Sequence, residues 1–178
     1  MIHRNIESSN HDEIVNLFTS VFTDSEGGAE GDALGNLTSE LSKSIDSKNI
    51  YCYATYIDDS IVASNFFSRL FFEENTSIYM LSPVAVSTNH QRKNIGQSII
   101  NYGLSEMKNM SVDIVVTYGD ISFYSKVGFA PLSEKIIQAP LKLSMPEGWL
   151  GLSIGNGEIA AINEKPNCVE EFNKPSLW

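Results

Sequence analysis

Cysteine and histidine are scarce in this chain of 178 residues. Its two cysteines, Cys52 and Cys168, form no CxxC pair, and its three histidines lack the i, i+4 spacing of a zinc protease. The sequence therefore predicts neither a metal site nor a disulfide framework, and a reducing compartment is expected.

Basic residues are also few. Lysine and arginine total 12 against 22 aspartates and glutamates, which gives a formal net charge of −10. Nucleic-acid binding depends on basic side chains that neutralise phosphates, so broad contact with nucleic acid is not expected. An acidic surface either maintains solubility or attracts a cationic partner, and both interpretations stay open.

Long apolar runs are missing as well. No stretch approaches the roughly 18 apolar residues of a membrane span, and the N-terminus lacks the continuous apolar segment of a signal peptide. We therefore expect a cytoplasmic protein that does not associate with membranes. The length fits a single domain, residues 1–178, which can bury roughly 70% of its unfolded surface without disulfide or metal support.

The first fifty residues show the periodicity of helices. A short opening strand is expected over residues 1–6, and Asn10 with Glu13 forms the pattern of a capping box before the first helix. Apolar residues at helical spacing define its buried face: Ile14, Leu17, Phe18, Val21 and Phe22. Residues 24–32, rich in glycine and acids, predict a mobile loop, and a second helix is expected from about 33 to 47.

The middle of the chain changes to strand patterns. Aromatic and β-branched residues predict three strands, over residues 50–57, 61–72 and 77–86, joined by turns at 58–60 and 73–75. Pro83 cannot donate to a sheet ladder, so it requires an edge, a bulge or an opening of the sheet. A helix over 96–110, a buried parallel strand over 113–118 and a short helix over 122–126 follow.

The last third, from about residue 131, alternates β-like segments with turns. The segments cover residues 136–139, 149–154 and 158–162, and the turns cover 146–148 and 155–157. We therefore expect an α/β fold, with a mixed central sheet flanked by helices and a β-rich C-terminal extension. The extension either covers the sheet or pairs with a second subunit in a homodimer.

A basic turn between the strand at 77–86 and the following helix is the clearest candidate binding site. Free amides at a helix start bind anions, and the helix dipole adds to the attraction. Arg92 and Lys93 add positive charge there, and Gly96 lets a phosphate approach the backbone. Neither the Walker loop nor the GxGxxG fingerprint is present. The turn alone leaves two interpretations open, a diphosphate site or a tight turn with two solvated basic residues.

Two motifs resemble those of the GNAT superfamily of N-acetyltransferases. Gln91, Asn94 and Gly96 match its motif A, with asparagine where the family usually has glycine. Asparagine is the non-glycine residue that best tolerates a left-handed backbone. Downstream, the match to motif B consists of Gly119, Asp120, Tyr124, Gly128 and Phe129. Together the motif-bearing region covers about residues 10–130.

The resemblance implies an enzyme that uses acetyl-CoA as co-substrate and needs no metal. In the family the sheet is splayed, and the pantetheine arm pairs with main-chain groups of one strand at the opening. Carried over to this sequence, those groups belong to Val84, Ala85 and Val86, with Pro83 at the expected bulge. The diphosphate would lie on the main chain of Gln91, Arg92, Lys93, Asn94, Ile95, Gly96, Gln97 and Ser98.

The resemblance also implies a catalytic role for Tyr124, as the general acid that protonates the departing thiolate. A phenol has a pKa of about 10, so it carries its proton at neutral pH. The alternative is a core aromatic with its hydroxyl in water. The attacking amine must lose a proton, and Glu73 and Glu74 are candidate bases, although turn carboxylates are usually only solvated.

The acceptor is expected to be a primary amine of a small molecule or a protein. Acidic residues near the glycine-rich segment could attract it: Glu26, Glu30, Asp32 and Glu40. A polyamine, an amino sugar and a protein amine all fit. Aromatic residues at 66–67 and 70–72 either line the acceptor pocket or pack one face of the hairpin. Two rival functions remain, a non-catalytic acyl-CoA-binding regulator and a purely structural α/β domain.

Overall fold

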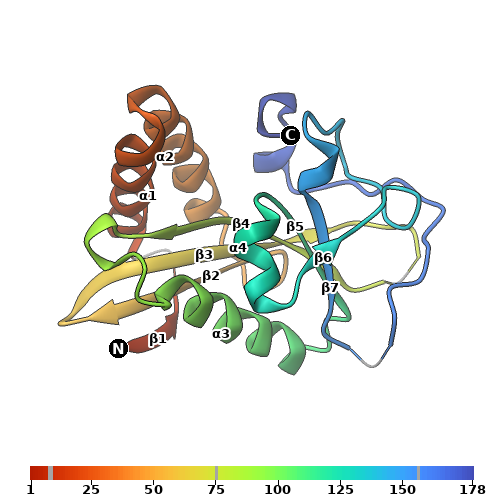
Figure 1. Ribbon diagram of the computed structural model, residues 1–178, viewed down its shortest axis with the longest axis horizontal. Helices are drawn as coiled ribbons and strands as arrows, with labels where there is room; N and C mark the ends of the chain where they lie inside the picture. The colour runs from red at the N-terminus through yellow and green to blue at the C-terminus, as the bar shows by residue number, and fades with distance from the viewer. Residues whose placement is uncertain (8–9, 75, 156) are drawn as a thin grey trace. The chain divides into compact units, whose positions relative to one another are not determined.

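The computed structural model describes residues 1–7, 10–74, 76–155 and 157–178. Among these residues, seven strands form one mixed sheet in the order β1-β2-β3-β4-β5-β7-β6 (Figure 1). The strands are β1 (Ile2–Asn5), β2 (Ile50–Ile57), β3 (Ser60–Leu70), β4 (Ile78–Val86), β5 (Ile114–Tyr118), β6 (Ala130–Pro131) and β7 (Trp149–Ser153). The α-helices are α1 (His11–Glu26), α2 (Gly28–Lys43), α3 (Ile95–Asn109) and α4 (Ile121–Tyr124). The mixed α/β fold expected from the sequence is confirmed.

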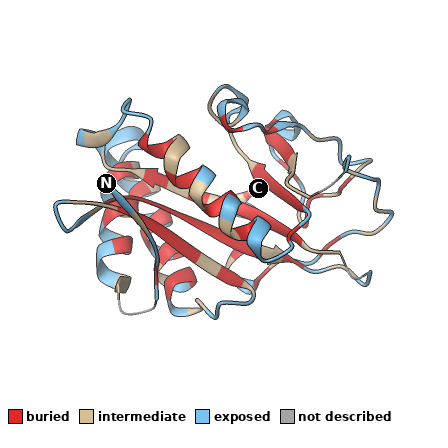
Figure 2. Cartoon of the chain, turned by 90° about the horizontal axis from the view of Figure 1, so that it is seen from below, coloured by how far each residue is buried: buried red, intermediate tan, exposed pale blue. Residues whose placement is uncertain are grey.

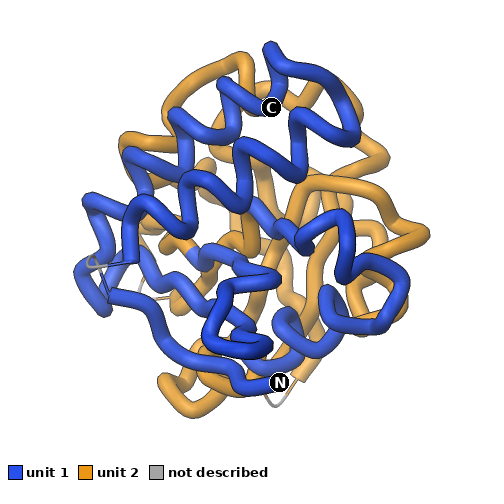
Figure 3. The backbone as a smooth tube through the Cα atoms, turned by 90° about the vertical axis from the view of Figure 1, so that its left-hand side faces the viewer, with its two compact units in different colours: residues 1–67, 83–103 blue, residues 68–82, 104–178 orange. Residues whose placement is uncertain are grey.

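The chain folds into two compact units, which Figure 3 colours separately. Unit 1 comprises residues 1–67 and 83–103, and unit 2 comprises residues 68–82 and 104–178. Strands β3 and β4 and helix α3 pass through both units, because the division falls within each of them.

In unit 1, helices cover both faces of the strands. The side chains of β3 alternate between the faces: Phe66 contacts Phe18 of α1 with ring centroids 5.9 Å apart, whereas Phe67 faces Gly103 of α3. A Cβ at Gly103 would lie 2.9 Å from Cζ of Phe67, so α3 packs against the sheet where it has no side chain. The strands are largely buried, while the helices expose their outer surfaces (Figure 2).

The predicted mobile loop at residues 24–32 is wrong. Helix α1 continues to Glu26 and α2 begins at Gly28, so a single residue, Gly27 (φ 99°), joins them. The glycines of α2 serve packing instead. A Cβ at Gly31 would lie 2.8 Å from the carbonyl oxygen of Thr19, so only glycine lets α1 and α2 approach this closely. Asn10 precedes α1 as expected, but its side chain makes no capping hydrogen bond.

The strand predictions in the middle of the chain are confirmed. Strand β2 has the predicted bounds, and Asp58 (φ 49°) and Asp59 (φ 61°) form the turn to β3. The positive φ angles at both positions are those of a tight hairpin turn. Asn75, in the second predicted turn, lies outside the described residues.

Unit 2 contains the buried parallel strand. Strand β5 pairs in parallel with β4 and antiparallel with β7, and Val115 and Val116 are fully buried. The tail packs through its indoles: Trp149 Nε1 donates to the carbonyl of Ile137 at 2.9 Å, and the ring of Trp178 lies 6.1 Å from that of Trp149.

The tail is less β-rich than predicted. Strand β7 lies within the predicted segment 149–154, but segments 136–139 and 158–162 are not strands. Indole packing and short 3₁₀ helices, such as Glu170–Phe172, take their place. The short strand β6 pairs with β7 and was not expected. Asn156, in the last predicted turn, lies outside the described residues.

Candidate active site

The turn that follows β4 is held closed by its own side chains. The Gln91 side-chain amide donates to the carbonyl of Val86 at 3.1 Å. Lys93 Nζ donates to the carbonyl of Asn89 at 3.0 Å, across the 3₁₀ turn Thr88–His90. The side chains of Val84 and Val86 are half-buried and alternate with the buried Pro83 and Ala85. Unit 1 thus places residues 84–86 and the predicted diphosphate turn in one continuous segment.

Two residues of this turn have a left-handed backbone. The φ angles of Arg92 and Asn94 are 59° and 60°. The first helical hydrogen bond runs from the amide of Ser98 to the carbonyl of Asn94 at 3.0 Å. The amides of Ile95, Gly96 and Gln97 precede that bond, so they are available to a ligand at the positive end of the helix dipole. Asn94 thus adopts the left-handed backbone that asparagine tolerates better than other non-glycine residues.

His3 of β1 contacts the first turns of α3. Its ring nitrogens lie 2.9 Å from Thr55 Oγ1 and 2.9 Å from Ser98 Oγ, and its ring centroid lies 5.2 Å from that of Tyr102. Burial lowers the pKa of His3 below its usual 6.5. A neutral imidazole therefore connects the edge strand to the helix that begins at the diphosphate turn.

This arrangement predicts a loss of stability in acid. The unfolded chain protonates His3 near pH 6.5, whereas the folded protein does so only at lower pH. The stability that His3 contributes is therefore complete above that pH and is lost as the pH falls below it. We expect the Tm advantage of the wild type over His3→Gln to shrink between about pH 7.5 and 5.0. A constant difference in Tm across that range would contradict the prediction.

In unit 2, the register between β4 and β5 ends before either strand does. Backbone pairing joins Ile78–Met80 to Ile114–Val116. At the next position a side-chain hydrogen bond joins the two strands: Thr117 Oγ1 donates to the carbonyl of Leu81 at 2.8 Å. Thr117 is fully buried.

Tyr124 lies at the end of α4, close to β5. Its ring centroid lies 5.1 Å from that of Phe123 and 5.7 Å from that of Phe129. A Cβ at Gly119 would lie 2.8 Å from Cε2 of Tyr124, so glycine makes room for the phenol ring.

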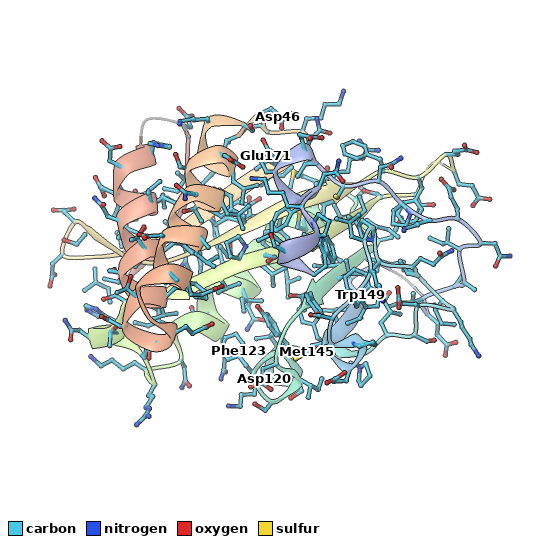
Figure 4. The ribbon with its side chains drawn as sticks, turned by 90° about the horizontal axis from the view of Figure 1, so that it is seen from above. Asp46, Asp120, Phe123, Met145, Trp149 and Glu171 are labelled. Atoms are coloured by element: carbon cyan, nitrogen blue, oxygen red, sulfur yellow. The ribbon has the colours of Figure 1, made fainter. Side chains whose placement is uncertain are left out.

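Burial keeps the Tyr124 phenol of α4 neutral, and hydrogen bonds to Asp120 stabilise the start of the helix. Burial raises the pKa of Tyr124 above its usual 10.0, although the nearby Thr117 side chain opposes that shift. Asp120 caps α4 (Figure 4): its carboxylate accepts from the amide of Ser122 at 2.8 Å and from its hydroxyl at 2.6 Å. These bonds lower the pKa of Asp120.

The candidate bases lie in an exposed loop. The amides of Glu73 and Glu74 donate to the carboxylate of Glu164 in the tail, and Phe71 forms a β-bridge with Asn167. Both glutamates belong to unit 2, as does Tyr124. The proposed acceptor-attracting acids Glu26, Glu30, Asp32 and Glu40 lie on α1 and α2 of unit 1.

Two side chains that connect the elements around the candidate site, Thr117 and His3, were not identified from the sequence. A threonine in the apolar run of β5 was the available signal for Thr117. His3 carried no such signal, because its partners Thr55 and Ser98 are distant in sequence. Within the described residues, no group of three or more His, Cys, Asp or Glu side chains is arranged to hold a metal ion. The described helices are also too short or too polar to span a membrane.

The chain matches one protein-family model and a set of solved structures. The family model of the acetyltransferase (GNAT) domain matches residues 3–132. No curated protein sequence matches the chain.

Solved structures of similar fold cover nearly the whole chain. YhbS, a GNAT family N-acetyltransferase from Escherichia coli in complex with CoA, shares 18% identity at a TM-score of 0.81, covering 97% of this chain and 92% of that one. A GNAT family acetyltransferase from Brucella melitensis in complex with acetyl-CoA shares 17% at 0.72, covering 97% of each chain. An aminoglycoside 6′-N-acetyltransferase complexed with coenzyme A shares 14% at 0.64, covering 89% and 99%. At these identities the likeness is one of fold.

Proposed function

Because this chain belongs to the GNAT family of acetyltransferases, we propose that it transfers the acetyl group of acetyl-CoA to a primary amine by direct attack. The observation that carries the proposal is the left-handed turn at Arg92 and Asn94, which opens directly into the amide-rich start of α3. Structural neighbours of similar fold were solved with CoA or acetyl-CoA, which supports the same co-substrate here.

The proposed diphosphate site consists mainly of backbone groups. Amides at the start of α3 would donate to the diphosphate oxygens, and the dipole of α3 would favour its negative charge. The main chain of Val84, Ala85 and Val86 would hold the pantetheine arm. The Val86 carbonyl already accepts from Gln91, so Gln91 would act by shaping the turn.

Acetyl-CoA supplies the acetyl group as a thioester, and the chain supplies the proton for the departing sulfur. Tyr124 suits this role because burial raises its pKa, so its hydroxyl is protonated at neutral pH. The attacking amine would release its proton to water, directly or on the way to the candidate bases Glu73 and Glu74.

We propose a small-molecule amine as the acceptor. Aminoglycoside acetyltransferases are among the structural neighbours, and the net charge of −10 would attract a cationic amine. Acids on α1 and α2 are exposed or half-buried and would contribute to this attraction. Two features favour the rival regulatory module: asparagine in place of glycine at position 94, and the lack of an assigned general base. The first argument is weakened, since Asn94 adopts the backbone that glycine would supply.

Substitution of Asn94 tests the binding site. Asn94→Gly keeps the left-handed conformation, so the Kd for acetyl-CoA should stay within about twofold of the wild type. Asn94→Ala disfavours φ near 60° by about 1 kcal/mol, so the Kd should rise about fivefold. Isothermal titration of acetyl-CoA into both variants measures the difference. Equal affinities of the two variants for acetyl-CoA would show that the backbone conformation at Asn94 does not determine binding.

An amine panel tests the reaction itself. Thiol release from acetyl-CoA would be followed with spermidine, kanamycin and a lysine-containing peptide as separate acceptors. The proposal expects steady thiol release above the background hydrolysis with at least one small amine. Tight binding of acetyl-CoA without turnover on any of them would favour the regulatory module.

A further inference from the structure

His3 lies on the edge strand of the sheet and bonds to two other elements. Strand β1 is the first strand in the sheet order (Figure 1), and His3 stands opposite Thr55 in its register with β2. Nδ1 of His3 lies 2.9 Å from Thr55 Oγ1, and Nε2 lies 2.9 Å from Ser98 Oγ of α3. Both ring nitrogens are therefore engaged, one with the neighbouring strand and one with the helix.

The helical partner, Ser98, closes the first turn of α3. Its amide makes the first helical hydrogen bond, to the carbonyl of Asn94 at 3.0 Å. The amides of Ile95, Gly96 and Gln97 precede that bond, and they are the donors proposed for the diphosphate. His3 is thus bonded to the residue that completes the turn carrying these amides.

Other contacts attach α3 to the sheet beyond its first turn. The side-chain amide of Asn65 on β3 donates to the carbonyl of Ile99 at 3.1 Å, and Gly103 packs against β3 where a Cβ would not fit. These contacts hold the body of the helix. The bond between His3 and Ser98 acts closer to the helix start, so it constrains the amide-bearing turn more directly.

The start of a helix frays readily, because its first amides have no helical hydrogen bonds. A ligand that binds to frayed amides must order them, and that ordering weakens its affinity. A side chain that already holds the first turn in place removes this penalty. His3 is suited to do so, since it is itself bonded to Thr55, which is fully buried in β2.

We propose that His3 is a positioning residue of the diphosphate site: its hydrogen bond to Ser98 holds the first turn of α3 in the conformation that receives acetyl-CoA. The inference rests on the proposed function, in which the diphosphate lies on the amides of that turn. His3 acts through Ser98 and the backbone. Its effect is therefore on the affinity for acetyl-CoA, whereas kcat at saturating acetyl-CoA does not depend on it.

Isothermal titration of acetyl-CoA tests the inference. His3→Phe keeps a ring beside Tyr102 and removes both hydrogen bonds, so the Kd should rise about fivefold. His3→Gln should stay within about twofold of the wild type, because its amide can still pair with the Ser98 hydroxyl. With the most active amine of the panel, kcat of His3→Phe at saturating acetyl-CoA should stay within about twofold of the wild type.

Ser98→Ala removes the same bond from the other end. Its Kd should also rise about fivefold. The double variant, His3→Phe with Ser98→Ala, should bind no more weakly than either single variant, because one bond is lost in all three. Multiplied effects would contradict the inference, because Ser98 would then act on the cofactor independently of His3.

His11→Phe is the matched control for a general loss of stability. Nε2 of His11 lies 3.3 Å from Ser39 Oγ, so this histidine also bonds to a serine, but it joins α1 to α2. Whatever its Tm, the Kd of His11→Phe for acetyl-CoA should stay within about twofold of the wild type. An equal rise in Kd in His3→Phe and His11→Phe would show that His3 has no specific role.

The same titrations separate this inference from the proposed function. An unchanged Kd in His3→Phe, or in Ser98→Ala if the phenylalanine variant does not fold, would overturn the inference. A wild-type protein that does not bind acetyl-CoA would instead overturn the proposed function itself.

Discussion

Replacing Tyr124 with phenylalanine is expected to lower kcat about 100-fold and to change the Kd for acetyl-CoA by less than about twofold. The substitution removes one hydroxyl and keeps the ring between Phe123, Phe129 and Gly119. General acids typically contribute factors of this size because an unprotonated thiolate is a poorer leaving group in the transition state. Steady-state thiol release and isothermal titration measure the two quantities.

Tyr118→Phe is the matched control for this prediction. Tyr118 also carries a phenol near the end of β5, but its hydroxyl lies 3.0 Å from Ser144 Oγ and accepts from the amide of Met145 at 2.8 Å. Its kcat should stay within about twofold of the wild type. If Tyr124→Phe and Tyr118→Phe have the same turnover, Tyr124 is not the acid.

Gly31→Ala is expected to lower the free energy of unfolding by about 2 kcal/mol, although alanine favours helices more than glycine does. The added Cβ would meet the side chain of Thr23 and lie 2.8 Å from the carbonyl oxygen of Thr19. A backbone carbonyl within α1 cannot move aside on its own, so α1 and α2 must separate. Thermal unfolding should show a Tm lower by about 4–8 °C.

Gly28→Ala provides the comparison, because it makes the same substitution on the same helix in open space. Nothing lies within 4 Å of a Cβ at Gly28. Its free energy of unfolding should be unchanged or higher by about 0.5 kcal/mol. Equal losses of stability in the two variants would show that helix packing does not explain the need for Gly31.

Where one local pattern dominates, the sequence predicted the fold well. The aromatic and β-branched run of β2 and the apolar run of β5 each specify a strand without help from distant residues. Helix α1 buries Ile14, Leu17 and Phe18 as its spacing indicated. In these segments periodicity and burial agree, so local sequence is sufficient.

The errors arose where a residue serves a distant partner. Glycine in residues 24–32 was interpreted as flexibility, but Gly31 provides space for a neighbouring helix. In the tail, the positions of Trp149 and Trp178 depend on carbonyls of Ile137 and Phe172. Such contacts have no local periodicity, so segments 136–139 and 158–162 were wrongly assigned as strands.

The candidate site also contains features that the sequence predicts and features that it does not. The left-handed conformation of Asn94 was predictable, because few residues tolerate it and one of them stands at the motif position. The bond from Thr117 to Leu81 was not, since it joins two strands 36 residues apart in sequence. The bonds from the backbone amides of Glu73 and Glu74 to the Glu164 carboxylate were not predictable either, because Glu164 lies 91 and 90 residues away in sequence.

The most direct test of the account is a crystal structure of the protein with acetyl-CoA. The account predicts the diphosphate within hydrogen-bonding distance of the backbone amides between Arg92 and Ser98, with the thioester sulfur facing the hydroxyl of Tyr124. A diphosphate bound elsewhere on the chain, or a thioester with no path to that hydroxyl, would contradict it.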